Sequence, residues 1–243
     1  MTVDWEELGW ERLADGVGRR RLPVWDCTVG LVCAEGSALL VDAGSSLAEG
    51  ALLRRQAQRL AGCRVGSLAL THPHFDHVFG AAAFAGARVF AAGDARPVFE
   101  GGREELSADA VRNGLDAGAA DEAAGALVVP HETVREAVSL TIGGREVLLH
   151  DAGPGHTGHD LAVVVPGEPT VVFCGDLVEE SGAPQAGPDA VPALWPAALD
   201  RLLELGGEDA VYVPGHGAVV DAAFVRAQRD ALAERFGVTP GSA

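Results

Sequence analysis

THPHFDH, residues 71–77, determines how the rest of the sequence is interpreted, because it places three of the eight histidines within six residues. It follows an apolar run that predicts a buried strand. His72 and His74 are two residues apart, so on an extended chain their side chains point the same way and can hold one ion. A turn into a helix would direct Asp76 and His77 towards a second ion. The stretch therefore predicts two neighbouring metal sites at the end of a strand.

Three later motifs each offer one further metal ligand, and each follows a predicted strand. The motifs are GPGHTG, FCGDL and VPGHG. A glycine stands beside each candidate ligand, as expected where the backbone must turn sharply around an ion. The predicted metal-ligating residues are His72, His74, Asp76, His77, His156, Asp176 and His216.

Along the chain, a β-rich stretch followed by a stretch of mixed strands and helices occurs twice. Residues 8–42 predict several short strands, and Ser46 can cap a helix that continues to about Gly62. A second β-rich run covers residues 126–176, and two helices follow, with one strand between them. This order predicts an α/β fold in which two similar halves pack sheet against sheet as a four-layer αββα sandwich. We expect a single domain over residues 1–243.

Residues 101–125 interrupt this alternation. The segment is rich in alanine, glycine and acidic residues, so we expect weak helix at best. It is long for a plain connection and is predicted to be a mobile lid or a surface insertion. The loop from Val178 to Pro196 follows Asp176 and is expected to border the pocket.

The charged residues exclude several classes of protein. The chain has 18 arginines and no lysine, against 35 acidic residues, for a net charge of −17. Without lysine it cannot be a Walker-type NTPase, a Schiff-base or pyridoxal enzyme, or a lysine-dependent protein kinase. The acidity disfavours nucleic acids and anionic membranes as partners, and no apolar stretch approaches the roughly 20 residues of a membrane helix. We expect a small-molecule substrate, no nucleic-acid partner and no membrane partner, and leave the oligomeric state open.

The cysteines favour a reducing compartment. Cys27, Cys33, Cys63 and Cys174 show no C-x-x-C spacing, and the first residues are acidic where a secretory signal needs basic ones. We therefore expect a cytoplasmic protein. Cys174 lies in the apolar run VVFC and is expected to be a buried small side chain rather than a metal ligand.

The ordered set THPHFDH, GPGHTG, FCGDL and VPGHG, preceded by LLVDAG at residues 39–44, resembles the metallo-β-lactamase superfamily in its binuclear, glyoxalase-II-like branch. The resemblance covers about residues 14–220. It implies an αββα sandwich with the site on one edge, between the sheets. It also implies a first metal held by His72, His74 and His156, a second held by Asp76, His77 and His216, and Asp176 as the bridge between them.

The implied activity is hydrolysis by a metal-bridging hydroxide. Two divalent ions that share a water lower its pKa to near neutrality, so an ester, thioester, lactone or amide of a small metabolite could be cleaved. Zinc is the expected metal, with iron and manganese as alternatives. Asp76 is the expected catalytic residue, as a proton relay. The alternative function is a mononuclear iron sulfur dioxygenase on the same fold, with iron held by His72, His156 and Asp176.

Comparison within the superfamily leaves the substrate open. The true β-lactamases lack the bridging aspartate that stands here as Asp176 and are normally secreted. Glyoxalase II has an additional helical domain, for which too few residues follow His216. The lactonases carry a tyrosine three residues after the bridging aspartate, where this sequence has Glu179. We expect Glu179 either to face solvent or to bind a donor group on the substrate.

Other residues receive less specific predictions. Asp42 either orients a ligand histidine through a hydrogen bond or caps a turn. Isolated histidines are more often surface or supporting residues than ligands. This expectation applies to His150 and His159, while His131 is expected in a turn, and Trp195 and Tyr212 are expected in the core.

Overall fold

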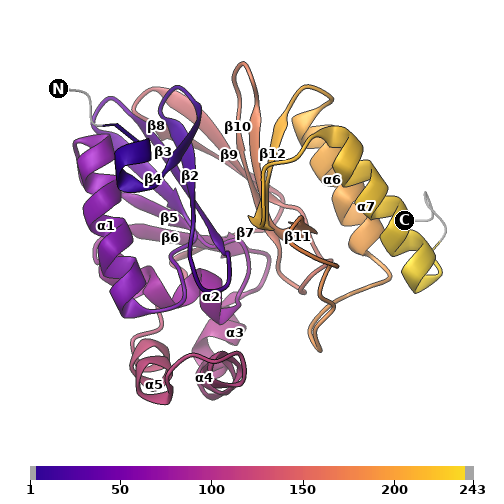
Figure 1. Cartoon of the computed structure of the whole chain (residues 1–243), viewed down its shortest axis with the longest axis horizontal. Helices are drawn as coiled ribbons and strands as arrows, with labels where there is room; N and C mark the ends of the chain where they lie inside the picture. The colour runs from indigo at the N-terminus through magenta and orange to yellow at the C-terminus, as the bar shows by residue number, and fades with distance from the viewer. Residues whose placement is uncertain (1–3, 239–243) are drawn as a thin grey trace.

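The computed structural model describes residues 4–238, which form two β-sheets between outer layers of helices (Figure 1). The remaining residues of the predicted domain, 1–3 and 239–243, lie outside the described part. The first sheet runs in chain order, β1-β2-β3-β4-β5-β6-β7, antiparallel from β1 to β4 and parallel from β4 to β7. Its strands are β1 (Glu11–Ala14), β2 (Val17–Arg21), β3 (Thr28–Ala34), β4 (Ser37–Val41), β5 (Ser67–Ala69), β6 (Arg88–Ala92) and β7 (Glu132–Val134).

The second sheet has the order β12-β11-β10-β9-β8. Only β11 and β12 pair in parallel, and the other neighbours are antiparallel. Its strands are β8 (Ala137–Ile142), β9 (Arg145–Asp151), β10 (Leu161–Val165), β11 (Val171–Glu179) and β12 (Val211–His216). The chain therefore completes one sheet before it begins the other.

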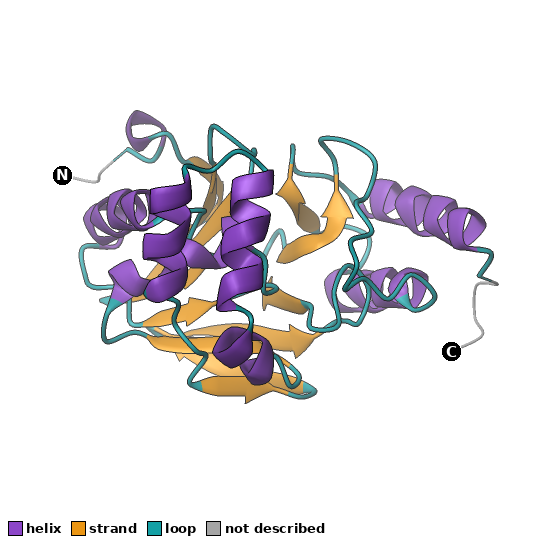
Figure 2. Ribbon diagram, turned by 90° about the horizontal axis from the view of Figure 1, so that it is seen from below, coloured by secondary structure: helices purple, strands orange, loops and turns teal. Residues whose placement is uncertain are grey.

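Helices cover the outer face of each sheet, as Figure 2 also shows. The longest ones are α1 on the first sheet and α6 and α7 on the second. The helical segments are η1 (Glu6–Leu8), α1 (Leu47–Ala61), α2 (Phe75–Val78), η2 (Phe79–Phe84), α3 (Arg96–Gly101), α4 (Arg103–Arg112), α5 (Ala117–Gly125), α6 (Trp195–Gly206) and α7 (Ala222–Phe236). Among the described residues, no helix is both long and apolar enough to cross a membrane.

Three apolar clusters separate the four layers and confirm the predicted αββα sandwich. One lies between the first sheet and its helices, one between the two sheets, and one between the second sheet and α6 and α7. Strand β10 shows how alternation supplies two of them: Leu161 and Val163 face the other sheet, while Ala162 and Val164 face the helices. Strands buried on both faces explain the continuous apolar runs in the sequence.

Helix α1 has the ends that the sequence predicts. The side chain of Ser46 accepts a hydrogen bond from the Glu49 N–H, and Gly62 ends the helix with φ +67°. Ser46 thus satisfies an N–H group that the helix itself leaves unpaired, and Gly62 adopts the left-handed conformation in which helices commonly end.

The prediction of weak helix over residues 101–125 is wrong. The segment contains the end of α3 and all of α4 and α5. The Asp116 side chain caps α5, and Leu106 and Ala110 of α4 are buried. Alanine has the highest helix propensity and lets the two helices approach closely, so helix forms although the apolar stripe is weak. Whether the segment moves as a lid stays a prediction.

Two glycines allow the segment after THPHFDH to lie against α1. A Cβ at Gly50 would overlap the carbonyl oxygen of Gly80, and one at Gly80 would overlap that of Ala43. The Ala43 N–H donates to the His77 carbonyl at 2.8 Å, and the Gly80 N–H donates to the Gly44 carbonyl at 3.0 Å. This close contact fixes the backbone that carries Asp76 and His77.

We expect Gly50→Ala to lower the free energy of unfolding by about 1–3 kcal/mol, because the added methyl group overpacks the contact between α1 and η2. Urea unfolding of the purified variant measures the change. Gly66→Ala is the matched control, since a Cβ there meets no heavy atom within 4 Å. Equal stability of the two variants would contradict the tight contact.

Candidate metal centre

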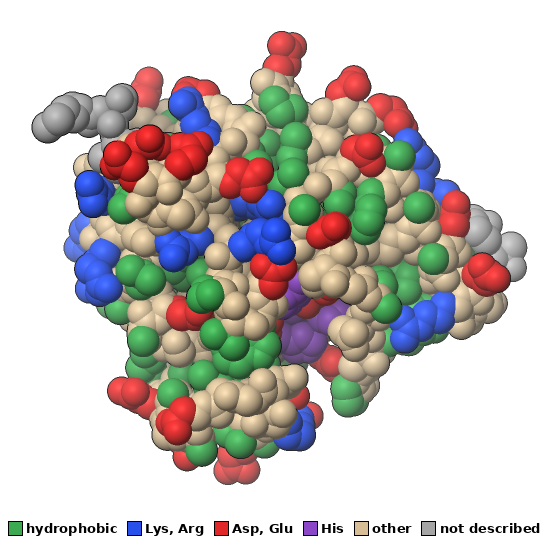
Figure 3. Space-filling view, in the orientation of Figure 1, with side chains coloured by type: hydrophobic (Ala, Val, Ile, Leu, Met, Phe, Trp, Pro, Cys, Tyr) green, Lys and Arg blue, Asp and Glu red, His purple; other side chains and the backbone are tan. Residues whose placement is uncertain are grey.

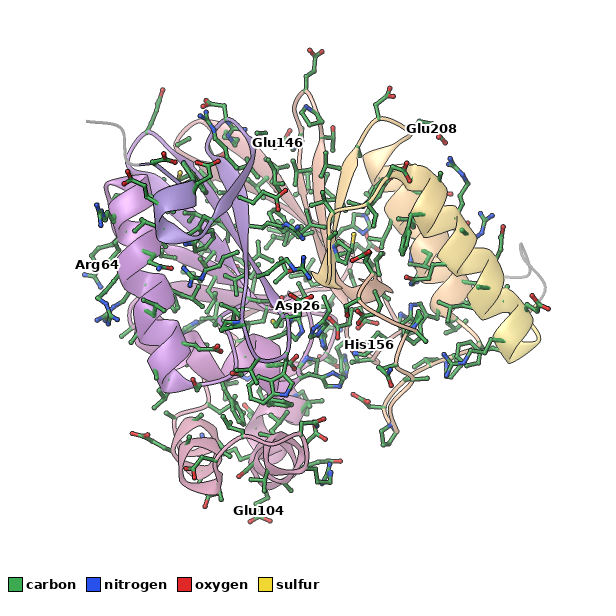
Figure 4. All side chains as sticks on the ribbon, in the orientation of Figure 1. Asp26, Arg64, Glu104, Glu146, His156 and Glu208 are labelled. Atoms are coloured by element: carbon green, nitrogen blue, oxygen red, sulfur yellow. The ribbon has the colours of Figure 1, made fainter. Side chains whose placement is uncertain are left out.

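All seven predicted ligands meet at one edge of the sandwich, between the two sheets. Four lie in the bend and short helix after β5, one lies between β9 and β10, one within β11 and one at the end of β12. Figure 4 shows His156 near the middle of the molecule, between the two halves. Residues more than 140 positions apart in the sequence, from His72 to His216, are thus brought into one cluster.

The first group of ligand atoms consists of three histidine nitrogens and one carboxylate oxygen. His156 Nε2 lies 3.1 Å from His74 Nδ1 and 3.5 Å from Asp176 Oδ2. His72 Nε2 lies 3.7 Å from the same oxygen. The chain bends at residues 71–73 rather than staying extended, but His72 and His74 still share one group, as the spacing predicts.

The second group contains two histidine nitrogens and both aspartates. His77 Nε2 lies 3.2 Å from Asp176 Oδ1, and His216 Nε2 lies 3.3 Å from Asp176 Oδ2. Asp76 Oδ2 lies 3.3 Å from His216 Nε2 and 3.6 Å from His77 Nε2. Asp176 belongs to both groups, which is the position that the bridging role requires.

These distances fit tetrahedral coordination. Two ligands about 2.0–2.1 Å from one ion at a tetrahedral angle lie about 3.4 Å apart, close to the 3.1–3.7 Å measured here. His72 Nε2 and Asp176 Oδ1 are buried and have no hydrogen-bond partner. Buried polar atoms without a partner are rare unless something absent satisfies them. The residues present therefore fit a metal ion in each group.

Glycine leaves room for the bridging carboxylate. A Cβ at Gly215 would overlap Asp176 Oδ1, and one at Gly175, where φ is +54°, would lie 2.8 Å from the Thr71 Cβ. Only glycine fits both positions without displacing a ligand or the residue before His72. Steric crowding therefore explains why glycine stands at these positions of FCGDL and VPGHG.

Asp42 connects two of the ligand histidines. It is buried, its Oδ2 lies 2.8 Å from His77 Nδ1, and the same oxygen accepts a hydrogen bond from Thr71 Oγ1 at 2.8 Å. Thr71 Oγ1 in turn lies 3.0 Å from His72 Nδ1. Of the two alternatives for Asp42, the structure favours the orienting role, because fixing one ring nitrogen leaves the other free for an ion.

The other three histidines are held by oxygen atoms that the sequence did not single out. His74 Nε2 lies 3.0 Å from Asp189 Oδ2, His156 Nδ1 lies 3.0 Å from the Gln185 carbonyl, and His216 Nδ1 lies 2.6 Å from the Trp25 carbonyl. Gln185 and Asp189 belong to the loop predicted to border the pocket. Each of the five histidines therefore has one nitrogen bound to an outer oxygen and the other in the cluster.

The cluster keeps its bridging carboxylate ionised. Burial alone would raise the pKa of Asp176, but the neighbouring His77, His216 and His72 hold it well below the usual value. An ionised carboxylate surrounded by imidazoles is the donor set that a borderline divalent cation prefers.

The loop that carries His156 is built around a buried carboxyl group. Asp160 accepts hydrogen bonds from the Thr157 N–H at 3.0 Å and from Thr157 Oγ1 at 2.8 Å, while burial raises its pKa to about 7. Trp195 is fully buried, as expected of a core residue, and its ring lies 5.4 Å from that of His156. The core thus packs against the His156 ring.

The cluster of candidate ligands opens onto a cavity of about 590 Å³, within the range of small-molecule sites. In Figure 3 histidine side chains are visible in the hollow between the halves. Glu179 lines this cavity but is only 8% exposed, and its carboxylate accepts from the Ser181 N–H at 3.1 Å and from the Ser181 hydroxyl. The expectation that it faces solvent is wrong, because β11 continues through Glu179 beside His216.

The remaining histidines lie outside the cluster. His150 and His159 are half-buried outside the cluster, and His131 is exposed in a bend before β7. Tyr212 and Cys174 are buried in the core, as expected. Cys27 was not singled out, although its thiol lies 3.2 Å from the Asp76 carbonyl oxygen. It forms a β-bridge with His216 directly before β3, a contact between distant residues that the sequence does not signal.

Zinc should stabilise the metal-free protein. If free zinc exceeds its dissociation constant about 1,000-fold, binding adds about 4 kcal/mol, or about 8–16 °C in Tm for a chain of this size. A thermal scan with and without zinc measures the shift, with magnesium as the control cation because it prefers all-oxygen ligands. A zinc scan that coincides with the magnesium scan would contradict the site.

The chain is similar to known proteins in sequence. A family model described as the metallo-beta-lactamase superfamily matches residues 22–216. Metallo-beta-lactamase domain-containing protein 1 of Xenopus laevis is 32% identical over 147 residues, which are 59% of this chain and 51% of the relative. The match thus spans about half the length of that curated relative.

Solved structures share the fold. The metallo-beta-lactamase FIM-1 from Pseudomonas aeruginosa, in its mono-zinc form, is 22% identical, with a TM-score of 0.69 over 95% of this chain and 96% of that one. TMB-1 is 19% identical and VMB-1 is 18% identical, each with a TM-score of 0.70 over 94% of this chain and 97% of the other. At these identities the likeness establishes the architecture and leaves the substrate open.

Proposed function

This chain belongs to the metallo-beta-lactamase superfamily, and from that membership and the geometry of its cluster we propose that it is a hydrolase with two divalent metal ions, zinc in preference to iron or manganese. The proposed substrates are small molecules with an ester, thioester, lactone or amide bond. The first ion would be held by His72, His74, His156 and Asp176, and the second by Asp76, His77, His216 and Asp176.

One observation carries the binuclear proposal. Oδ2 of Asp176 faces His72 and His156 of the first group and also His216 of the second, while Oδ1 faces His77. A carboxylate that lies within ligand distance of the imidazoles of both groups suits a pair of ions better than a single one. This arrangement supports two ions over the mononuclear iron alternative.

The bound ions would supply an activated water and polarisation of the scissile carbonyl. The chain's own residues position these groups and move protons. Asp76 lines the cavity, and with Oδ2 turned to His216 Nε2 at 3.3 Å, the other oxygen of its carboxylate would receive a proton and pass it to the leaving group. Asp42 and Thr71 keep two histidines in the required orientation throughout.

Glu179 limits the choice among substrates. Its carboxylate lines the cavity and can accept a hydrogen bond, but when ionised it cannot donate one to a developing oxyanion. Lactone opening assisted by a phenol donor at this position is therefore not available. We propose that acyclic esters and thioesters are better substrates than lactones.

Metal analysis combined with a substrate panel tests the proposal. Protein purified without added metal should contain close to two equivalents, mainly zinc, and should hydrolyse thioesters and esters in a manner that a chelator abolishes. A lactone and an amide complete the panel. A single equivalent of iron, with oxygen consumption on a persulfide, would instead establish the dioxygenase.

We also propose that the protein acts in the cytoplasm. The four cysteines are unpaired in the structure, and Cys27 and Cys174 are buried as thiols. Free thiols are typical of a reducing compartment. Fractionation of the source cells, with detection of the native protein, tests this location.

A further inference from the structure

We propose that the cavity selects substrates whose non-reacting part carries a positive charge, with Asp109 of α4 as the specificity-determining residue. This inference rests on the proposed hydrolase function and extends it to a substrate class: cationic acyl compounds, such as those with an ammonium group, in preference to carboxylate-bearing or phosphate-bearing ones.

The side-chain charges on the cavity wall are negative. Apart from the metal-ligating residues, the wall presents the carboxylates of Asp109 and Glu179. Among the described residues that line the cavity, no arginine occurs, and the chain has no lysine. An anionic group on the substrate would therefore meet two carboxylates beyond the metal centre, and the wall itself offers it no arginine or lysine.

Aromatic side chains also line the cavity. Trp25 and Phe75 both line the cavity, with ring centres 5.3 Å apart and planes at 87°. The Trp25 indole N–H donates to the Asn113 carbonyl at 3.2 Å, and Asn113 follows α4 directly. Aromatic rings beside carboxylates form the usual environment for ammonium groups, through cation–π attraction and charge. The hydrogen bond fixes Trp25 against the helical segment that bears Asp109.

Asp109 is available to a ligand although it already has a partner. Arg112 Nη2 lies 2.9 Å from Asp109 Oδ1, but Arg112 is 63% exposed and follows Asp109 by one helical turn. Exposed ion pairs of this kind contribute little, so a substrate cation can replace or share the contact. The second carboxylate oxygen, Oδ2, takes no part in that pair.

Thioesters that differ only in charge test the inference on the zinc-loaded protein. Acetylthiocholine, S-acetyl mercaptoethanol and S-acetyl thioglycolate share one acyl group and carry positive, neutral and negative thiol parts; a second series places the charges on the acyl part. We expect kcat/KM for the cationic probe to exceed that for the anionic probe by about tenfold or more in one series. Equal hydrolysis of both, or preference for the anionic probe in both series, would overturn the inference.

Variants assign the preference to Asp109. Asp109→Asn should lower the cationic-to-neutral ratio of kcat/KM about threefold, the size of an exposed charge pair. Glu100→Gln removes a carboxylate that pairs with Arg96 on α3 outside the cavity, and should leave the ratio unchanged. An unchanged ratio in Asp109→Asn would reject Asp109 as the determinant.

A binding measurement separates this inference from the hydrolase proposal. Calorimetry with choline and with propionate on the metal-free protein needs no turnover. Choline should bind more tightly than propionate, and Asp109→Asn should weaken choline binding about threefold. If no probe is hydrolysed but choline binding behaves in this way, the hydrolase proposal fails and the cation site stands. If the neutral probe is hydrolysed but choline does not bind, the cation site fails and the hydrolase proposal stands.

Discussion

Replacing Asp176 with asparagine should lower kcat/KM for the best thioester or ester by on the order of 10³-fold and reduce the metal content to one equivalent or less. Oδ2 faces His72, His156 and His216, and Oδ1 faces His77. An amide places an NH₂ group at one of these positions, and nitrogen with two hydrogens cannot bind a cation. The variant also lacks the negative charge that both groups share.

The fold should survive this change, because three apolar clusters hold the layers together. Elemental analysis, steady-state kinetics and circular dichroism on the same preparation separate loss of metal from loss of structure. Asp200→Asn is the control, since Asp200 pairs with Arg229 away from the cavity. Near-normal turnover in Asp176→Asn, with two metal equivalents retained, would exclude the bridging role.

Asp42→Asn should weaken zinc binding by about 10- to 100-fold without touching a ligand atom. The carboxylate accepts from the Thr71 N–H, the Thr71 hydroxyl and His77 Nδ1. With an NH₂ group opposite His77, Nδ1 must become the acceptor, and the proton moves to Nε2, the nitrogen that faces Asp176. A protonated Nε2 cannot ligate an ion. Competition with a chromophoric chelator measures the affinity.

Asparagine is the informative replacement because Asp42 has φ +61°, a conformation that asparagine tolerates and alanine does not. Asp200→Asn again serves as the control. Unchanged zinc affinity in Asp42→Asn would show that packing alone orients His77. A nitrogen NMR spectrum of the metal-free variant reports the position of the proton directly.

The clustering of the candidate metal ligands could be predicted from sequence because their chemistry is concentrated in short motifs. Histidine and aspartate beside glycine at the ends of apolar runs are uncommon, and strand ends of one sheet meet at the same edge. The structure accordingly brings together His156, Asp176 and His216 with the residues of THPHFDH. The alternating rounds of strand and helix likewise predicted the layered fold.

The supporting contacts could not be predicted, and the reason is physical. His156 and His216 are held by the backbone carbonyls of Gln185 and Trp25, and a carbonyl has no sequence signature. Asp189 is one acidic residue among many in an acidic chain. Helices α4 and α5 were missed because alanines form much of their buried face, which leaves little contrast between the apolar and polar sides.

The chain passes from the first sheet to the second once, between β7 and β8, and each half contributes ligands to the cluster. A bound ion would therefore cross-link two consecutive parts of the polypeptide. The strands of these two parts belong to different sheets. Separating the two sheets at this edge would require breaking bonds to the metal ion. Metal binding should therefore raise the free energy of local opening there. Amide hydrogens at the ends of β5 and β12 would then exchange more slowly with solvent deuterium. Amide hydrogens near residues 166–169, in the turn between β10 and β11 and away from the metal cluster, would keep their exchange rates.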